Sequence, residues 1–139
     1  MPPFKRTIKN RIRGVAWSLY GKFLRNPGFP ENARKILFVC KGNICRSPFA
    51  ELLSKQIMSR KVKSSCAYEF ASVGIMLPDT KSPPTEAIHS ARQFDVEMAM
   101  HHPKLINYSI MASSDMIIVM DVWQFKYLRK IFVEHSYKI

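Results

Sequence analysis

The sequence has few of the features that mark a secreted or membrane-spanning protein. It contains only three cysteines, Cys40, Cys45 and Cys66, and an odd number cannot pair into a complete disulfide framework. The N-terminus lacks the continuous apolar core of a secretory signal. No run reaches the roughly 18 apolar residues that a membrane-spanning helix needs. We therefore expect one domain in a reducing, cytoplasmic compartment, with peripheral contact to a membrane left open.

Acidic residues are also scarce. Ten Asp and Glu face 22 Lys and Arg, which gives a net charge of +12. Residues 1–35 hold nine of the basic residues and one acid, so they carry +8 and leave +4 for the rest of the chain. The basic excess is thus mainly an N-terminal property, and its candidate partners are anionic lipid, nucleic acid or acidic protein.

Residues 4–25 have the pattern of an amphipathic helix. Their apolar residues recur every three or four positions, at Phe4, Ile8, Ile12, Val15, Leu19 and Phe23. The proline- and glycine-containing residues 26–30 end this pattern, so we expect a basic N-terminal extension, 1–34, ahead of a domain over 35–139. The helix either packs on its own domain or lies on an anionic membrane surface. Nucleic acid binding has no motif to support it, and we expect no specific nucleic acid.

From residue 35 onward the pattern alternates between strands and helices. A short apolar run, 36–39, is typical of a strand covered on both faces, and Ser47 with Pro48 suits a helix start. This alternation predicts an α/β fold with a parallel sheet. The expected strands are 36–39, 67–73 and 116–120, and the expected helices are 47–60, 84–94 and 122–132.

The loop after the first expected strand has the residues of an anion site. Gly42 and Asn43 both tolerate left-handed backbone, so the chain can curl there and turn its N–H groups inward. The next helix adds the positive end of its dipole, and Arg46 can hold two phosphate oxygens at once. Amides, helix and arginine together favour the thiolate form of Cys40. The pattern predicts phosphoryl transfer to Cys40 and hydrolysis of the cysteinyl phosphate; the alternative, a buried structural cysteine, does not explain these neighbours.

The same stretch resembles the signature of the low-molecular-weight protein tyrosine phosphatases. The matching residues are Cys40, Gly42, Asn43, Cys45, Arg46, Ser47, Pro48, Ala50 and Glu51. Further on, 72–74 (SVG) resembles the second strand of that family, and 114–121 (SDMIIVMD) resembles its third strand and the following turn. The resemblance covers roughly residues 35–139.

The resemblance implies a three-layer αβα fold with a short parallel sheet, of the phosphotyrosine phosphatase I-like type. It also implies that Cys40 is the nucleophile and Arg46 the phosphate clamp. The rest of the loop would bind substrate, through Lys41, Gly42, Asn43, Ile44, Cys45 and Ser47. The substrate would be a phosphotyrosine protein or a small aryl phosphate, and no metal or cofactor is expected.

Four further side chains have roles that the sequence leaves open. In this family the equivalent of Cys45 can form a disulfide with the nucleophile under oxidation and protect it; alternatively, Cys45 fills space beneath the loop. Either His101 or His102 matches a family histidine that supports the loop, unless both are surface residues. We assign no role to Cys66.

The chain departs from the family near its C-terminus. The family's general acid is an aspartate in an Asp-Pro loop, and no Asp-Pro occurs here. Residues 134–139 resemble the segment before a fourth strand, so the last strand, the acid loop and the final helix are expected to be missing. The third strand would then be a sheet edge. Asp79 and Asp121 are weak candidates for the acid, and Asp121 is better explained as a helix cap.

This departure keeps two other functions open. Without an acid, the loop can bind phosphate or phosphotyrosine without turnover. An arsenate reductase on the same scaffold needs two relay cysteines downstream, and only Cys66 follows Cys45.

Overall fold

A three-stranded parallel sheet forms the centre of the domain. The computed structural model describes residues 29–61, 68–80 and 82–139, and the predicted helix 4–25 and Cys66 lie outside them. The strands β1 (Lys35–Cys40), β2 (Glu69–Gly74) and β3 (Met116–Val119) are arranged in the order β2-β1-β3. Both pairings are parallel, with Cys40 opposite Gly74. The predicted parallel α/β fold is therefore confirmed.

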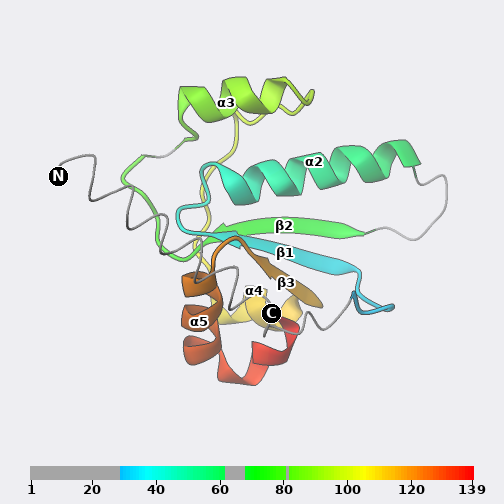
Figure 1. Cartoon of the computed structure of the whole chain (residues 1–139), viewed down its shortest axis with the longest axis vertical. Helices are drawn as coiled ribbons and strands as arrows, with labels where there is room; N and C mark the ends of the chain where they lie inside the picture. The colour runs from blue at the N-terminus through cyan, green and yellow to red at the C-terminus, as the bar shows by residue number, and fades with distance from the viewer. Residues whose placement is uncertain (1–28, 62–67, 81) are drawn as a thin grey trace. The chain divides into compact units, whose positions relative to one another are not determined.

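Helices cover both faces of this sheet (Figure 1). The helix α2 (Arg46–Lys61) lies on one face, and α3 (Thr85–Arg92) packs on α2 around buried Ala91 and Met98. On the other face lie α4 (Tyr108–Ser113), α5 (Val122–Ile131) and the short 3-10 helix η1 (Val133–Lys138). The three-layer αβα arrangement agrees with the prediction.

Alternating side chains of β1 supply the core. Leu37 and Val39 have no exposed surface and pack with Met111 of α4, Ile117 of β3 and Leu128 of α5. Ile36 and Phe38 point to the opposite face and are also buried, as the continuous apolar run predicts. This double coverage fixes the end of β1, and with it the position of Cys40.

Two segments differ from the sequence prediction. Helix α4 was not predicted because it has only six residues, although Asn107 caps it by accepting a hydrogen bond from the N–H of Ile110 at 2.9 Å. Residues 133–138 form η1, a 3-10 helix that the sequence did not predict either. Lys138 holds η1 in place by donating to the carbonyl of Ala112 at 2.7 Å, at the C-terminal end of α4.

Strand β3 is a sheet edge among the described residues, because it pairs with β1 alone. This agrees with the expectation. In the part of the chain that the structure describes, no helix is long and apolar enough to cross a membrane. The boundary proposed between 34 and 35 stays a prediction.

Candidate active site

The loop between β1 and α2 curls at one residue. Asn43 has a φ of 52°, in the left-handed region that asparagine tolerates. Gly42 does not need that region, and a Cβ added to it would meet Pro78 and Ile44 at ordinary contact distances of 3.6 Å. Both residues tolerate left-handed backbone, as expected from the sequence, and the loop uses that tolerance at Asn43. Asn43 alone makes the turn.

Asn43 also connects the loop to the rest of the domain. Its side chain is fully buried, and its Nδ2 donates to the hydroxyls of Ser47 at 2.9 Å and Ser72 at 2.8 Å. Its Oδ1 accepts from the backbone N–H of Lys104 at 2.8 Å. These partners come from α2, from β2 and from the segment before α4. One side chain thus ties three elements to the loop.

The sulfur of Cys40 lies at the base of this loop, and the residue is 3% exposed. The N–H of Asn43 donates to it at 3.2 Å, and the Ser47 hydroxyl lies 3.0 Å away. Because that hydroxyl already accepts from Asn43, its own hydrogen is available to the sulfur; the carbonyl of Val73 is a more distant acceptor at 3.3 Å. A backbone N–H and a hydroxyl therefore both lie within hydrogen-bond distance of the Cys40 sulfur.

Of the two histidines, His101 supports the loop. Its Nε2 lies 2.9 Å from the Asn43 carbonyl oxygen and 3.1 Å from Asn43 Oδ1. Both atoms are acceptors, so Nε2 carries the proton and donates. Burial lowers the pKa of His101, against the smaller opposing effect of its hydrogen bond to Asn43, and favours the neutral ring. His102 is exposed, so the surface interpretation holds for His102 and is wrong for His101.

Gly74 allows β2 to approach the loop. A Cβ at this position would lie 2.9 Å from the carbonyl carbon of Gly42 and 3.0 Å from the nitrogen of Asn43. Just beyond it, the N–H groups of Ile75 and Met76 donate to the carbonyls of Cys40 and Lys41, at 3.1 and 2.9 Å. The glycine of the SVG segment is thus required by a backbone-to-backbone contact, which sequence reasoning did not identify.

The remaining loop residues border the site in different ways. Arg46 and Lys41 are exposed, and within the described residues the Arg46 guanidinium has no hydrogen bond or ion pair. Cys45 is half-buried, and neither it nor the buried Cys40 forms a disulfide. Burial, followed by the proximity of Cys40, raises the pKa of Cys45, whereas Arg46 opposes this shift. Cys45 is therefore a thiol beside the predicted nucleophile.

The predicted substrate-binding role of the loop, from Lys41 to Ser47, and the redox role of Cys45 stay predictions. No group of three or more His, Cys, Asp or Glu among the described residues is arranged to hold a metal ion.

The aspartates differ in their surroundings. Asp121 caps α5, where its carboxylate accepts from the N–H of Trp123 at 3.4 Å. Asp115 accepts from the N–H groups of Lys35 and Arg34, which lower its pKa. Asp79 is exposed and follows Pro78, whose ring lies beside Gly42. Asp79 is therefore next in sequence to a residue that lies beside the loop.

Comparisons with known proteins place this geometry in context. The model of the family described as "Low molecular weight phosphotyrosine protein phosphatase" matches residues 35–139. The low molecular weight protein-tyrosine-phosphatase Ptp of Acinetobacter johnsonii is 32% identical over 97 residues, which are 70% of this chain and 63% of that protein. An arsenate reductase of Staphylococcus aureus is 29% identical over 87 residues, which are 63% of this chain and 60% of that protein.

Among solved structures, the Erwinia amylovora tyrosine phosphatase amsI superposes with a TM-score of 0.68. It is 26% identical, over 79% of this chain and 70% of that one. The chain spans about 60% of the length of the first curated relatives that it matches.

Proposed function

The chain belongs to the low molecular weight phosphotyrosine protein phosphatase family, and from this premise we propose that it hydrolyses phosphotyrosine and other aryl phosphate monoesters. The observation that carries the proposal is the convergence of the Ser47 hydroxyl and the Asn43 N–H on the Cys40 sulfur, at 3.0 and 3.2 Å. The similarity to the protein-tyrosine-phosphatase Ptp of Acinetobacter johnsonii supports the same class of reaction.

The proposed reaction has two steps. In the first, the Cys40 thiolate attacks phosphorus, an S–P bond forms, and the P–O bond to the aryl group breaks. The leaving phenolate takes up a proton. In the second step, water attacks phosphorus and the S–P bond breaks, which releases phosphate and regenerates the thiolate. Arg46 pairs with two phosphate oxygens, and the loop amides with the helix N-terminus offset the charge that builds on them.

The source of the proton on the leaving group decides which substrates react well. We propose Asp79 as the first candidate, because it follows Pro78, whose ring lies beside Gly42. Asp121 is the second, although its carboxylate already caps α5. A general acid speeds the departure of a poor leaving group far more than that of a good one.

Steady-state hydrolysis of two esters tests the proposal. One ester has an acidic phenol as its leaving group, the other is phosphotyrosine, and Cys40→Ser is the blank. Turnover of the activated ester alone supports a working nucleophile without an effective acid. If both esters turn over, Asp79→Asn and Asp121→Asn are measured next. The variant that removes the general acid slows the hydrolysis of phosphotyrosine and leaves that of the activated ester unchanged. Activity of neither ester above the blank would contradict the proposal.

In the last case, phosphate-dependent thermal stabilisation separates two explanations. A chain that phosphate stabilises is a phosphate-binding module, whereas a chain without a cooperative transition is not folded.

Arsenate reduction is the other candidate function, because the curated relatives include arsenate reductases. It is disfavoured because Cys66 is the single cysteine after Cys45. Arsenate-dependent consumption of a thioredoxin reductant measures it directly.

Two features of the setting belong to the proposal. A thiolate nucleophile stays active only where thiols are reduced, so we place the protein in the cytoplasm. The basic amphipathic segment 4–25 is proposed to contact anionic membranes. Co-sedimentation with anionic vesicles, with and without residues 1–25, tests the second point, and equal pelleting of the two forms removes it.

A further inference from the structure

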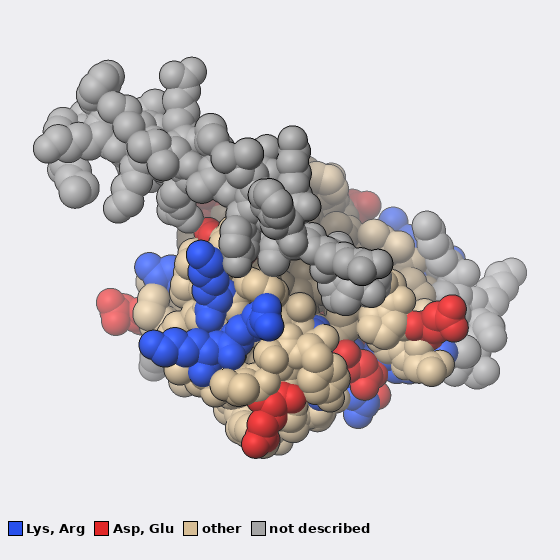
Figure 2. Space-filling model, turned by 60° about the horizontal axis from the view of Figure 1, so that its bottom comes forward, with Lys and Arg blue, Asp and Glu red and all other residues tan. Residues whose placement is uncertain are grey.

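Helix α5 and η1 form a surface of different character from the site. Helix α5 and η1 contain four basic residues, Lys126, Arg129, Lys130 and Lys138, and one acid, Glu134. Helix α5 itself contains no acid. Figure 2 shows Lys and Arg side chains gathered over this side of the described domain, with no Asp or Glu between them. The local charge is strongly positive outside the segment 1–34.

Large apolar side chains are exposed next to these cations. On α5, Tyr127 is 43% exposed and Ile131 54%. On η1, Val133 is 68% exposed and Tyr137 74%. Glu134, the one acid, is engaged by the hydroxyl of Tyr108. The surface therefore combines cations with apolar groups, while its carboxylate is already partnered.

We propose that this α5–η1 surface, formed by Tyr127, Arg129, Lys130, Ile131, Val133 and Tyr137, docks on an anionic lipid bilayer. Lipid headgroups provide the complementary negative charge, and the interfacial region accepts tyrosine and aliphatic side chains beside Lys and Arg. The proposal does not depend on Lys126, which already has an interaction of its own. It concerns the catalytic domain and is separate from the membrane contact proposed for residues 4–25.

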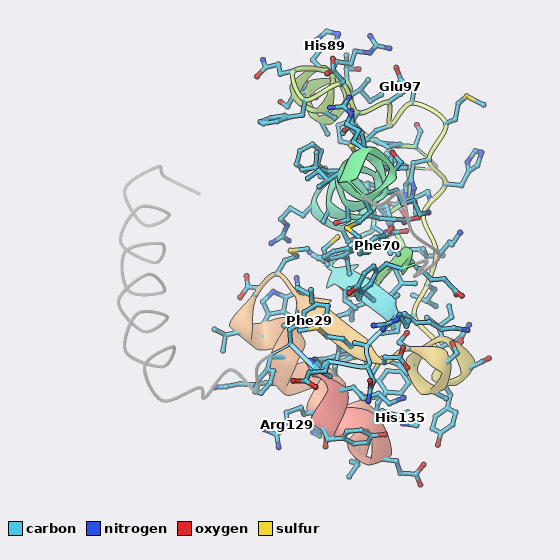
Figure 3. All side chains as sticks on the ribbon, turned by 90° about the vertical axis from the view of Figure 1, so that its right-hand side faces the viewer. Phe29, Phe70, His89, Glu97, Arg129 and His135 are labelled. Atoms are coloured by element: carbon cyan, nitrogen blue, oxygen red, sulfur yellow. The ribbon has the colours of Figure 1, made fainter. Side chains whose placement is uncertain are left out.

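The residues of this surface lie in the second half of α5 and in η1, away from the carboxyl edge of the sheet (Figure 1). Helix α5 begins near the carboxyl edge of the sheet, where Cys40 lies, and runs away from it (Figure 1). Figure 3 shows Arg129 and His135 at the opposite end of the domain from His89 and Glu97, which belong to the α3 region. Docking through α5–η1 is thus compatible with turnover of a small aryl phosphate.

Vesicle binding by the full chain tests this surface. The probes are vesicles of phosphatidylcholine, and of phosphatidylcholine with about 30% phosphatidylserine, the anionic lipid of such leaflets. The test variant is Arg129→Gln/Lys130→Gln, and Val133→Ser/Tyr137→Ser tests the apolar part. The matched control is Arg60→Gln/Arg92→Gln on α2 and α3, which removes the same charge from the other side of the sheet.

We expect wild type to prefer the anionic vesicles, and the α5 variant to lose roughly 30-fold in partitioning, about fivefold for each basic residue. The control should change much less. Separate membrane contacts multiply the partition coefficient. The ratio between wild type and the α5 variant is therefore the same whatever residues 1–34 contribute to binding. Amide exchange should show protection over 122–138 when anionic vesicles are present, and aryl phosphate turnover of the variants should stay at the wild-type level.

Three results would overturn the proposal. The first is equal partitioning of wild type and the α5 variant. The second is an equal loss in the α5 variant and the control, which would mean that only the net charge matters. The third is tight binding of a polyglutamate peptide without vesicle binding, which would assign the surface to an acidic protein. Circular dichroism establishes that each variant is folded before it is compared.

Discussion

At the scale of single residues, the candidate site depends on a few side chains that cannot be exchanged. Asn43 combines a left-handed φ with four side-chain hydrogen bonds, to Ser47, Ser72, Lys104 and His101. No other residue type provides an amide of that size at that backbone angle with an equal tolerance. The loop shape is therefore set by one buried residue rather than by its glycine.

Replacing Gly74 should damage the site, whereas replacing Gly42 should not distort it. In Gly74→Ala the new methyl group overlaps backbone atoms of Gly42 and Asn43, so we expect a loss of about 1–3 kcal/mol of stability and a loss of activity of roughly tenfold or more. Gly42→Ala is the matched control, since its Cβ has room. Chemical denaturation and kcat/KM measure both effects. Equal behaviour of the two variants would contradict this account.

His101 should make stability depend on pH. Burial lowers its pKa below the ordinary value of 6.5 in the folded protein, so the unfolded chain binds the proton more readily. Stability from this group is therefore present above about pH 6.5 and is lost as the pH falls through the window down to the folded pKa. His101→Gln keeps an N–H donor without titrating. The free energy of unfolding of wild type should fall relative to that of His101→Gln between about pH 7 and pH 5; parallel curves would exclude His101 as the cause.

Cys45 should protect the nucleophile rather than react first. Its pKa is raised, mainly by burial, so iodoacetamide at neutral pH should label Cys40 well ahead of it. After peroxide treatment, a reductant should restore wild-type activity but should restore less in Cys45→Ser, which has no partner thiol at that position. Mass spectrometry of the labelled peptides and recovered turnover measure this. Equal recovery in both proteins would leave Cys45 as a packing residue.

At the scale of elements, short connections position the loop as much as the strands do. The N–H of Gly74 donates to the carbonyl of Lys104 at 2.7 Å, and the N–H of Ile106 donates back to Gly74 at 2.9 Å. Asn107 then caps α4 directly after this contact. The segment 104–107 therefore connects β2, Asn43 and α4.

Removing the cap of α4 should separate stability from chemistry. Asn107→Ala loses the hydrogen bond to Ile110, and we expect about 1 kcal/mol of destabilisation with nearly normal turnover. Asn43→Ala, in contrast, should abolish turnover because the loop loses its shape. Thermal unfolding and aryl phosphate hydrolysis compare the two variants. A large loss of activity in Asn107→Ala would show that α4 positions the loop more directly than proposed.

At the scale of the whole domain, the site joins elements that are far apart in sequence. The loop contacts β2 through Ser72 and Gly74, and the segment before α4 through His101 and Lys104. A ligand held by the loop should therefore stabilise the entire domain. Binding to the folded state alone adds free energy in proportion to RT ln(1 + [L]/Kd).

Phosphate should raise the melting temperature of the domain. At a concentration of roughly 100 times its Kd it adds about 2.7 kcal/mol, which is several degrees for a domain of this size. Arg46→Ala should lose most of this shift because Arg46 is the proposed clamp. Sulfate at equal ionic strength, which resembles phosphate, should act similarly, and chloride should not. An undiminished shift in Arg46→Ala would place phosphate elsewhere.

The sequence by itself determined the local features of this protein. The apolar run 36–39, the Ser-Pro helix start and the Gly-Asn turn depend on nearest neighbours in the chain, so they predicted β1, α2 and the loop between them. The signature around Cys40 indicated the family for the same reason. The physical cause of each of these features lies within a few residues of it in the sequence.

Only the tertiary structure decided which distant residues reach the loop. It selected His101 over His102, because one of two adjacent side chains is buried against Asn43. It also explains why residue 74 is a glycine, because β2 approaches the loop closely there and brings together residues 32 positions apart in the chain. Such contacts depend on how strands and helices pack, and the residues next to each other in the sequence do not determine that packing.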